Sequence, residues 1–341
     1  MLRNPGLEQA IRERPDDVEP FLVYADWLAQ QGDARGELIV VQHALDDARL
    51  PREEVTRLRG RERELMRLVW PSLRPAIEAE LLRAADWRWG FVDRLHLCRS
   101  SHVEEGPPDL LPVARALLES PPLAVVRSLA LGLLHPTDNT GAVEELLAFA
   151  GSAPVGAGLR ALAIGELDGR IGDLGPEWQP GPLGDVSAPL APFVRLETLT
   201  IRGAGARADG RLELPSLNLL LLEAEEGLES ILAALEAPRL RVLALRATAD
   251  TDLLVARLAM MPFASTLERL DLGESALTDA GARTVAELAA RWRRLVWVDV
   301  TRNRLTADGL AALHRAGVST VGDRSQRPIT DENDDEEPDD E

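Results

Sequence analysis

The sequence contains no lysine, and all 38 of its basic residues are arginine. This absence excludes a Schiff-base lysine, a lysine general base and the lysine of a nucleotide-binding P-loop. The chain also has one cysteine, Cys98, so it can form no internal disulfide. A lone cysteine is typical of a cytosolic protein.

Aromatic residues are scarce and long apolar runs are missing. Aromatics make up 4% of the chain against 45% for all hydrophobic residues, so the interior must be mainly aliphatic. No run reaches the roughly 18 apolar residues that a membrane helix needs. The first residues, Met1 to Gly6, lack the apolar stretch of a secretory signal. We therefore expect a cytoplasmic protein with no membrane span.

The net charge is −19, and part of it lies at the C-terminal end. Residues 331–341 carry nine acidic groups and no basic one, so −10 remains without them. An acidic chain disfavours nucleic acid as a partner, because phosphate binding needs a basic face. The acidic segment is too charged to fold alone. It is either a solvating disordered end, or a segment that imitates nucleic acid or holds a basic partner.

The pattern Leu-x-x-Leu-x-Leu recurs along most of the chain. It is clearest at 240–245 and 267–272, and looser copies begin at Val92, Val126, Leu159, Leu196, Leu217 and Leu295. Alternate residues of a strand face opposite sides, so the leucines of each copy should point into a common core. Recurrence of one strand motif predicts a solenoid, in which each unit buries its apolar face against its neighbours.

Most of the segments between these strands have the apolar spacing of helices. Apolar residues recur near 3.6 positions in segments 113–119, 143–150, 228–235, 253–261, 280–292 and 307–315. The stretch 165–192 is rich in Gly and Pro and predicts an irregular crossing. The unit after Leu196 is too short for a helix and predicts an extended loop.

The first 85 residues differ from the rest and predict a small helical unit. Expected helices cover Phe21–Leu28 behind Pro20, Gly36–Leu45 and Arg52–Val69. A last helix is expected through Ile77, Leu81 and Leu82.

Three segments resemble two known families. Residues 267–282, LERLDLGESALTDAGA, and 295–313 resemble the ribonuclease-inhibitor-like class of leucine-rich repeats. Asn303, and Ser275 one unit earlier, take the place of the buried asparagine that bonds neighbouring turns in such repeats. The N-terminal Tyr24-Ala-Asp-Trp-Leu28, with Gly32-Asp33 and Arg35-Gly-Glu37, resembles the bacterial repeat-companion domain.

The resemblance implies an α/β leucine-rich-repeat solenoid with an N-terminal α-helical cap. Parallel strands would line a concave face, with helices and loops outside. The expected domains are a helical cap at 1–85, the solenoid at 86–322 and a disordered acidic tail at 323–341. The implied protein is bacterial, non-enzymatic and interacts with other proteins.

Strand alternation places one set of side chains on the concave face, which is the predicted binding surface. The predicted partner-binding residues are Thr198, Thr200, Arg202, Leu219, Leu221, Arg246, Arg269, Asp271, Trp297 and Asp299. The same alternation should also display Arg94, His96, Val242 and Ala244, and small residues at Ser128, Ala130, Ala161 and Ala163 should let a partner backbone approach closely. A solvent-facing Trp beside Arg and Asp is typical of an interface hot spot. Trp297 could instead only cover the C-terminal end of the stack.

Each of the other candidate functional residues could instead have a purely structural role. Asp26 could orient a substrate or ion, or it could pair with Arg35 or cap a helix while Trp27 fills the junction with the first repeat. Cys98 could be a nucleophile or a partly buried inert thiol. Together with His96 and His102 it could form a ligand cluster, or all three could be ordinary residues of the first strand.

The sequence therefore favours a binding scaffold or sensor that recognises a protein on its concave face, with no catalytic residue, metal or cofactor. The alternative is a regulatory or substrate-recruiting subunit of a partner enzyme, such as a protease or defence effector, docked through the helical domain. A hydrolase is disfavoured, because no Ser-His-Asp or Cys-His arrangement is readable.

Overall fold

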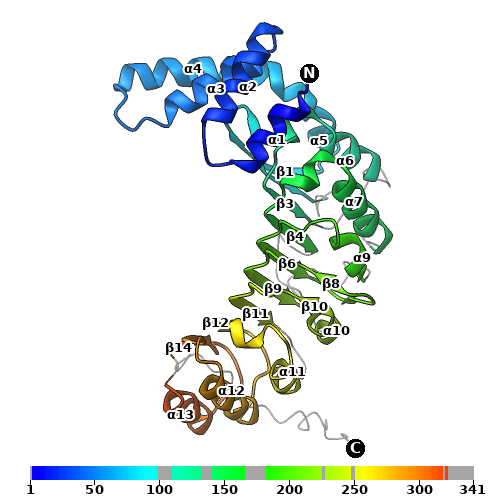
Figure 1. Cartoon of the computed structure of the whole chain (residues 1–341), viewed down its shortest axis with the longest axis vertical. Helices are drawn as coiled ribbons and strands as arrows, with labels where there is room; N and C mark the ends of the chain where they lie inside the picture. Colours follow the sequence, from blue (N-terminus) through cyan, green and yellow to red (C-terminus); the bar gives the residue numbers. More distant parts are fainter. Residues whose placement is uncertain are drawn as a thin grey trace, which may run out of the picture.

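The structure is a computed structural model that describes residues 2–98, 110–132, 140–165, 182–224, 227–246, 250–317 and 319–321. Figure 1 shows the strands along one side of an elongated molecule, with helices α6, α7, α9, α10 and α11 along the other. The expected acidic tail lies outside the described residues, so its predicted disorder stays a prediction.

Helices occupy most of residues 2–81. They are α1 (Pro5–Glu13), α2 (Glu19–Gln30), α3 (Arg35–Leu45), α4 (Arg52–Val69) and α5 (Arg74–Glu78), with a 3₁₀ turn η1 (Trp70–Ser72) before α5. The three helices expected over 21–69 are confirmed, whereas α1 was not expected. Asn4 begins α1, and its side chain accepts a hydrogen bond from the Leu7 amide at 3.2 Å.

The Gly32-to-Glu37 motif builds the joint between α2 and α3. Arg35 is fully buried, and its Nη2 lies 2.9 Å from the Asp33 carboxylate. Arg35 therefore pairs with Asp33, and the expected pairing with Asp26 was wrong. Gly36 lets the helices approach, because a Cβ there would lie 2.6 Å from the Ala25 carbonyl oxygen.

The last expected helix of this segment was wrong in its second half. It ends at Glu78, and Leu82 belongs to a strand, β1 (Leu82–Arg88). Glu80 adopts a left-handed φ of 51°, and the Leu81 amide bonds back to the Ala76 carbonyl at 2.9 Å. A left-handed residue followed by this return bond terminates a helix, although the apolar spacing continues past it. The predicted domain limit at 85/86 falls inside β1.

Strand β1 forms an antiparallel hairpin with β2 (Phe91–Leu97). Both turn residues have positive φ, 43° at Trp89 and 76° at Gly90, as a two-residue turn of this kind requires. The hairpin packs on the helices through edge-to-face aromatic pairs. Ring centroids lie 4.9 Å apart for Phe21 and Trp89, and 5.3 Å apart for Tyr24 and Phe91.

After this hairpin, every strand of the main sheet runs parallel to its neighbours. The strands are β3 (Ser128–Leu131), β4 (Ala161–Gly165), β6 (Thr198–Arg202), β9 (Leu219–Glu223), β11 (Val242–Arg246), β12 (Arg269–Asp271), β13 (Trp297–Asp299) and β14 (Ser319–Val321). In the described chain the sheet has ten strands, in the order β1-β2-β3-β4-β6-β9-β11-β12-β13-β14. All eight expected motif strands are confirmed as one parallel series, which is an α/β repeat fold, whereas β14 was not expected.

A single register runs through the series and aligns the motif leucines. One buried row consists of Leu95, Leu129, Leu162, Leu199, Leu220, Leu243, Leu270 and Val298. A second consists of Leu97, Leu131, Ile164, Ile201, Leu222 and Leu245. Full burial of each such side chain is worth about 1.5–3 kcal/mol, so a shift of one residue in any strand would be costly.

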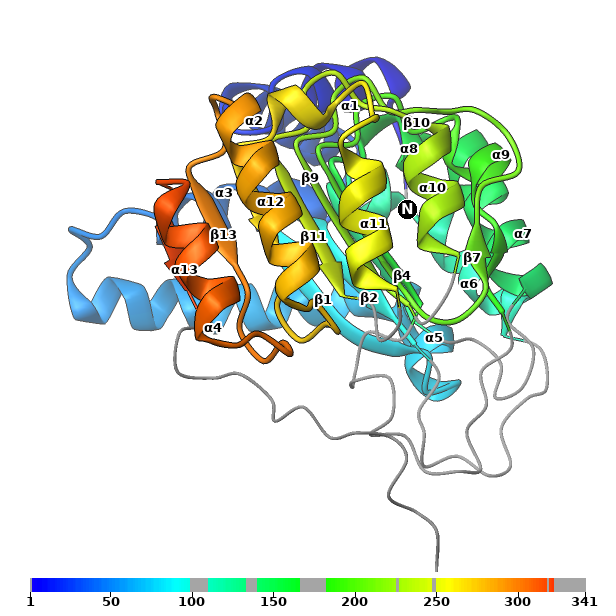
Figure 2. The same cartoon turned by 90° about the horizontal axis from the view of Figure 1, so that it is seen from below.

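The connections cover the buried side of the sheet. Six expected helical segments are confirmed as α6 (Leu111–Leu118), α7 (Thr140–Ser152), α10 (Leu228–Ala234), α11 (Thr251–Leu258), α12 (Asp279–Arg291) and α13 (Ala307–Arg315). Their apolar residues join the two strand rows in one core. Figure 2 shows α10 to α13 side by side in chain order.

Shorter elements complete the described connections. These are η2 (Pro121–Leu123), α8 (Pro154–Gly158), β5 (Gly184–Asp185), α9 (Ser187–Leu190), β7 (Ala206–Arg207), β8 (Leu212–Glu213), β10 (Leu235–Glu236) and η3 (Ala264–Thr266). The crossing after Leu196 is extended through β7 and β8, as expected. In the Gly- and Pro-rich crossing, residues 166–181 lie outside the described residues. Its described part contains the short strand β5 and the one-turn helix α9.

Buried polar side chains join the last units. Asn303 is fully buried, and its Oδ1 accepts a hydrogen bond from the Leu277 amide at 2.9 Å. Its Nδ2 donates to the Leu272 carbonyl at 2.7 Å. Ser275 donates to the Leu245 carbonyl at 3.0 Å one unit earlier. The expected bonding role of both residues is therefore confirmed.

We predict that Asn303→Ala lowers the free energy of unfolding by about 2–4 kcal/mol, because it leaves a buried amide and a buried carbonyl without partners. Urea unfolding followed by circular dichroism measures the change. Asn218→Ala is the matched control, since Asn218 is exposed at the start of a strand. Equal small losses in both variants would contradict a joining role for Asn303.

Candidate functional site

The candidate site is the strand face, defined here as the side chains of β2 to β13 that alternate with the buried rows. Parallel register arranges them in two lines. The first line is Arg94, Ser128, Ala161, Thr198, Leu219, Val242, Arg269 and Trp297. The second is His96, Ala130, Ala163, Thr200, Leu221, Ala244, Asp271 and Asp299. The register thus brings the predicted set onto one surface, apart from Arg202 and Arg246, which lie at the C-terminal ends of β6 and β11.

The end of the strand face nearest the hairpin is small and hollowed. Ser128 and Ala161 are half-buried and line a cavity of about 570 Å³. The other lining residues are Pro15, Asp16, Asp93, Arg94, Arg127, Arg160 and Glu197. The small side chains leave this space open, as expected. Of the charged residues around it, Arg94 was expected on this face and the others were not.

Charged residues around this hollow form ion pairs between neighbouring strands. Arg127, Arg160 and Glu197 each lie just before a strand, and Asp93 lies within β2. Arg127 holds Asp93 with two hydrogen bonds, one of 2.9 Å, and Arg160 pairs with Glu197. Asp16, in the loop after α1, lies 2.8 Å from Arg127 and 3.0 Å from Arg88. The hydrogen bond to Asp93 raises the pKa of Arg127, and the one from Arg88 lowers the pKa of Asp16. The hollow therefore has fixed, paired charges at its rim.

The middle of the strand face is apolar. Leu219, Leu221 and Val242 are half-buried and lie on the adjacent strands β9 and β11. Ala244 was expected to be displayed, but it is 6% exposed. Its methyl group is shorter than the flanking Leu221 and Asp271 of the same line, so these neighbours shield it. The apolar middle of the strand face therefore consists of Leu219, Leu221 and Val242.

Arg202 and Arg246 do not flank the face as free cations. Arg202 makes two hydrogen bonds of 3.0 and 3.1 Å to Glu223, one strand away. Arg246 lies 3.7 Å from Glu223 on one side and 3.7 Å from Asp271 on the other. Glu223 was not predicted. It occupies the same position in β9 that Arg202 and Arg246 occupy in β6 and β11, so comparing this position between units would have revealed it.

The far end of the strand face combines an aromatic ring with charges. Trp297 is half-buried beside the exposed Arg269, and Asp271 pairs in register with Asp299. Each carboxylate accepts a hydrogen bond of 2.8 Å from a backbone amide two residues later. Burial raises the pKa of Asp271, and the negative charge of Asp299 adds to this effect.

Trp297 does not cover the end of the sheet. Strand β14 pairs with β13 on the far side from β12, with Ser319 opposite Trp297. The indole therefore belongs to the strand face, and the alternative role as a terminal cover was wrong.

The remaining sequence candidates lie apart from the strand face or at its edge. Asp26 is exposed on α2, and Trp27 is half-buried with its ring centroid 5.6 Å from that of Tyr24. Trp27 also packs on the aromatic cluster that joins the helices to the hairpin. Cys98 is buried after β2. His102 lies outside the described residues, so the structure does not test the alternative of a ligand cluster that includes it.

Within the described part of the chain, no group of three or more His, Cys, Asp and Glu side chains is placed to hold a metal ion. No helix there is both apolar enough and long enough to span a bilayer.

Comparisons with known proteins give distant likenesses. No protein-family model and no curated protein matches the chain. A solved structure of a Bacteroides fragilis protein is similar at a TM-score of 0.46 and 16% identity, covering 64% of this chain and 71% of that one. An internalin from Listeria monocytogenes is similar at 0.29 and 15%, covering 67% and 86%. Both scores are low, and the repeat fold rests on its own strand order and register.

We predict that Asp271→Asn raises the free energy of unfolding at pH 7, where the partly buried carboxylate is charged. A carboxyl whose pKa is raised by folding destabilises the folded state above that folded pKa. This cost disappears below the unfolded pKa of about 3.8. Urea unfolding should therefore show a gain at pH 7 that vanishes near pH 3.

The control for this prediction is Asp26→Asn, which neutralises an exposed carboxyl on α2. We expect it to leave stability nearly unchanged at both pH values. A loss of stability at pH 7 in Asp271→Asn would show that its attraction to Arg246 outweighs its burial.

Proposed function

We propose that this protein is a cytoplasmic, non-enzymatic leucine-rich-repeat scaffold that binds a protein partner on its strand face. The helices at 2–81 then cap the first repeat, and the parallel units form a solenoid. The observation that carries the proposal is the one-sided cover of the sheet. Apolar residues of the outer helices fill the core on one side, while the other side holds half-buried side chains from consecutive strands.

The chemistry of the strand face supports a protein partner over nucleic acid. Arg127, Arg160, Arg202 and Arg246 already pair with carboxylates, so few cations remain for phosphates. The apolar middle at Leu219, Leu221 and Val242 suits aliphatic side chains of a partner.

The two ends of the strand face supply complementary kinds of contact. The hollow over Ser128 and Ala161 admits a protruding backbone, and Trp297 with Arg269 and Asp271 supplies the anchors. A partner that spans these regions would bury roughly 1,600 Å² in total, the usual size of a specific protein interface.

We predict that Trp297→Ala weakens partner binding by about 2 kcal/mol, or roughly 30-fold, because an aromatic anchor is lost. Affinity capture from the native lysate with mass spectrometry identifies the partner. Calorimetry with the purified partner then measures the affinity of each variant. Leu221→Arg should weaken binding as well, since it places a charge in the apolar middle.

Leu253→Ala is the matched control, because Leu253 is an apolar residue 47% exposed on α11, on the helical side. Thermal unfolding confirms that each variant is folded. Unchanged affinity in both strand-face variants, with unchanged melting temperatures, would reject the strand face as the binding surface.

A further inference from the structure

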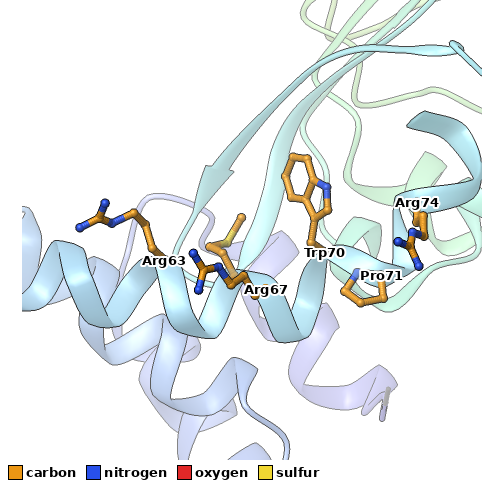
Figure 3. A pocket seen from close by; sticks show the side chains of 6 residues that line it. Arg63, Arg67, Trp70, Pro71 and Arg74 are labelled. Atoms are coloured by element: carbon orange, nitrogen blue, oxygen red, sulfur yellow. The ribbon is translucent and has the colours of Figure 1, made fainter. Parts of the chain in front are cut away.

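A second hollow lies on the N-terminal helices, away from the strand face. It has a volume of about 490 Å³ and is lined by Arg63, Met66, Arg67, Trp70, Pro71 and Arg74. Figure 3 shows Trp70 between Arg67 on α4 and Arg74 at the start of α5. We call this hollow the arginine pocket.

The spacing of α4 explains why these side chains share one surface. Leu58, Leu65 and Val69 are buried against α3. Arg63, Met66, Arg67 and Trp70 follow at intervals of three and four, so they lie along a different line of the helix. Trp70 remains 40% exposed there, although a large aromatic side chain is stabilised by burial. The pocket thus offers an aromatic surface that the described residues leave partly open.

Two of the three guanidinium groups of the arginine pocket lack the ion pairs that other arginines of α4 make among the described residues. Elsewhere on α4, Arg57, Arg59 and Arg61 each pair with a glutamate. Arg63 bonds only to the Arg59 carbonyl, at 3.3 Å, and neither it nor Arg67 has an acidic partner among the described residues.

Arg74 has a partner, Glu78 at 3.2 Å, but both side chains are largely exposed. No acidic residue is among the described residues that line the pocket. In a chain with a net charge of −19, this concentration of cations indicates a complementary anionic occupant.

We propose that the arginine pocket binds the acidic C-terminal segment of this chain, residues 331–341. The segment carries nine carboxylates and no cation, which complements a pocket with three guanidinium groups and no carboxylate. Arginine binds carboxylates well, because its planar fork can donate two parallel hydrogen bonds. Within the segment, Pro338 lies between Glu337 and Asp339, so an apolar ring can contact Trp70 while flanking carboxylates meet arginines.

The chain beyond β14 sets the reach of this segment. Twenty residues, 322–341, follow Val321, and a fully extended chain of this length spans up to about 66–72 Å. Binding would rest on several exposed ion pairs, each of which contributes only about a two- to five-fold gain in affinity. The total affinity from these ion pairs is therefore moderate, and it falls as salt screens the charges.

A labelled peptide of residues 328–341 tests the proposal by fluorescence anisotropy with the full-length protein. We expect saturable binding at about 50 mM salt that weakens at least tenfold at about 500 mM. The variant Arg63→Gln/Arg67→Gln/Arg74→Gln should weaken binding at least tenfold, and Trp70→Ala should weaken it several-fold. Arg57→Gln/Arg59→Gln/Arg61→Gln is the control, because it removes equal charge from the same helix and should change binding less than threefold.

The full-length chain with all nine acidic residues of 331–341 changed to Asn or Gln tests whether the native segment occupies the pocket. This variant should bind the peptide several-fold more tightly than the wild type, since its own segment no longer competes. If the native segment competes with the peptide equally at all protein concentrations, it docks on the pocket of its own chain. If the competition grows with protein concentration, it docks on the pocket of a second copy. Either result supports the proposal.

Three results would overturn the proposal. These are absence of peptide binding at low salt by the chain with the neutralised segment, equal weakening by the two triple arginine variants, and no gain in affinity when the segment is neutralised. Melting temperatures within a few degrees of the wild type show that the variants are folded.

Discussion

The structure depends on the in-register stacking of aliphatic side chains from one strand to the next. Leu220 packs between Leu199 and Leu243 at the same strand position, and this arrangement repeats along the sheet. Because a strand motif alone has no interior, each unit obtains its apolar environment from the units on either side. The same stacking fixes which residues alternate with the core. The strand face is thus a consequence of the core and requires no separate folding determinant.

Charges are distributed by the same register. The residue after the first apolar residue of the motif is basic at Arg127, Arg160 and Arg241 and acidic at Asp93, Glu197 and Glu268. Register places opposite charges side by side, and pairs form between 93 and 127, 160 and 197, and 241 and 268. Exposed pairs of this kind contribute little stability individually. Their larger effect is to leave the face nearly neutral, so its apolar and aromatic side chains would govern what it binds.

Periodicity predicted the eight parallel strands and six outer helices, because each motif copy contains its own core side chains. It failed where a backbone conformation decided the structure. The left-handed turn at Glu80 and the tight turn at Trp89-Gly90 make the segment after α5 into strand β1. In the site, alternation predicted the two lines of the strand face but could not predict burial of Ala244 or the role of Glu223. Both depend on the lengths and charges of neighbours one strand away.

The strand face and the arginine pocket differ in whether their arginines already hold carboxylates. This difference determines which surface an acidic chain favours. At the edges of the strand face, Arg127 and Arg202 already hold carboxylates through two hydrogen bonds each, so an acidic chain would have to displace an internal partner. Arg63 and Arg67 hold none among the described residues, and an acidic chain gains attraction there without such a loss. The acidic segment therefore favours the arginine pocket over the strand face. Its docking there would leave the apolar middle and Trp297 open to another protein.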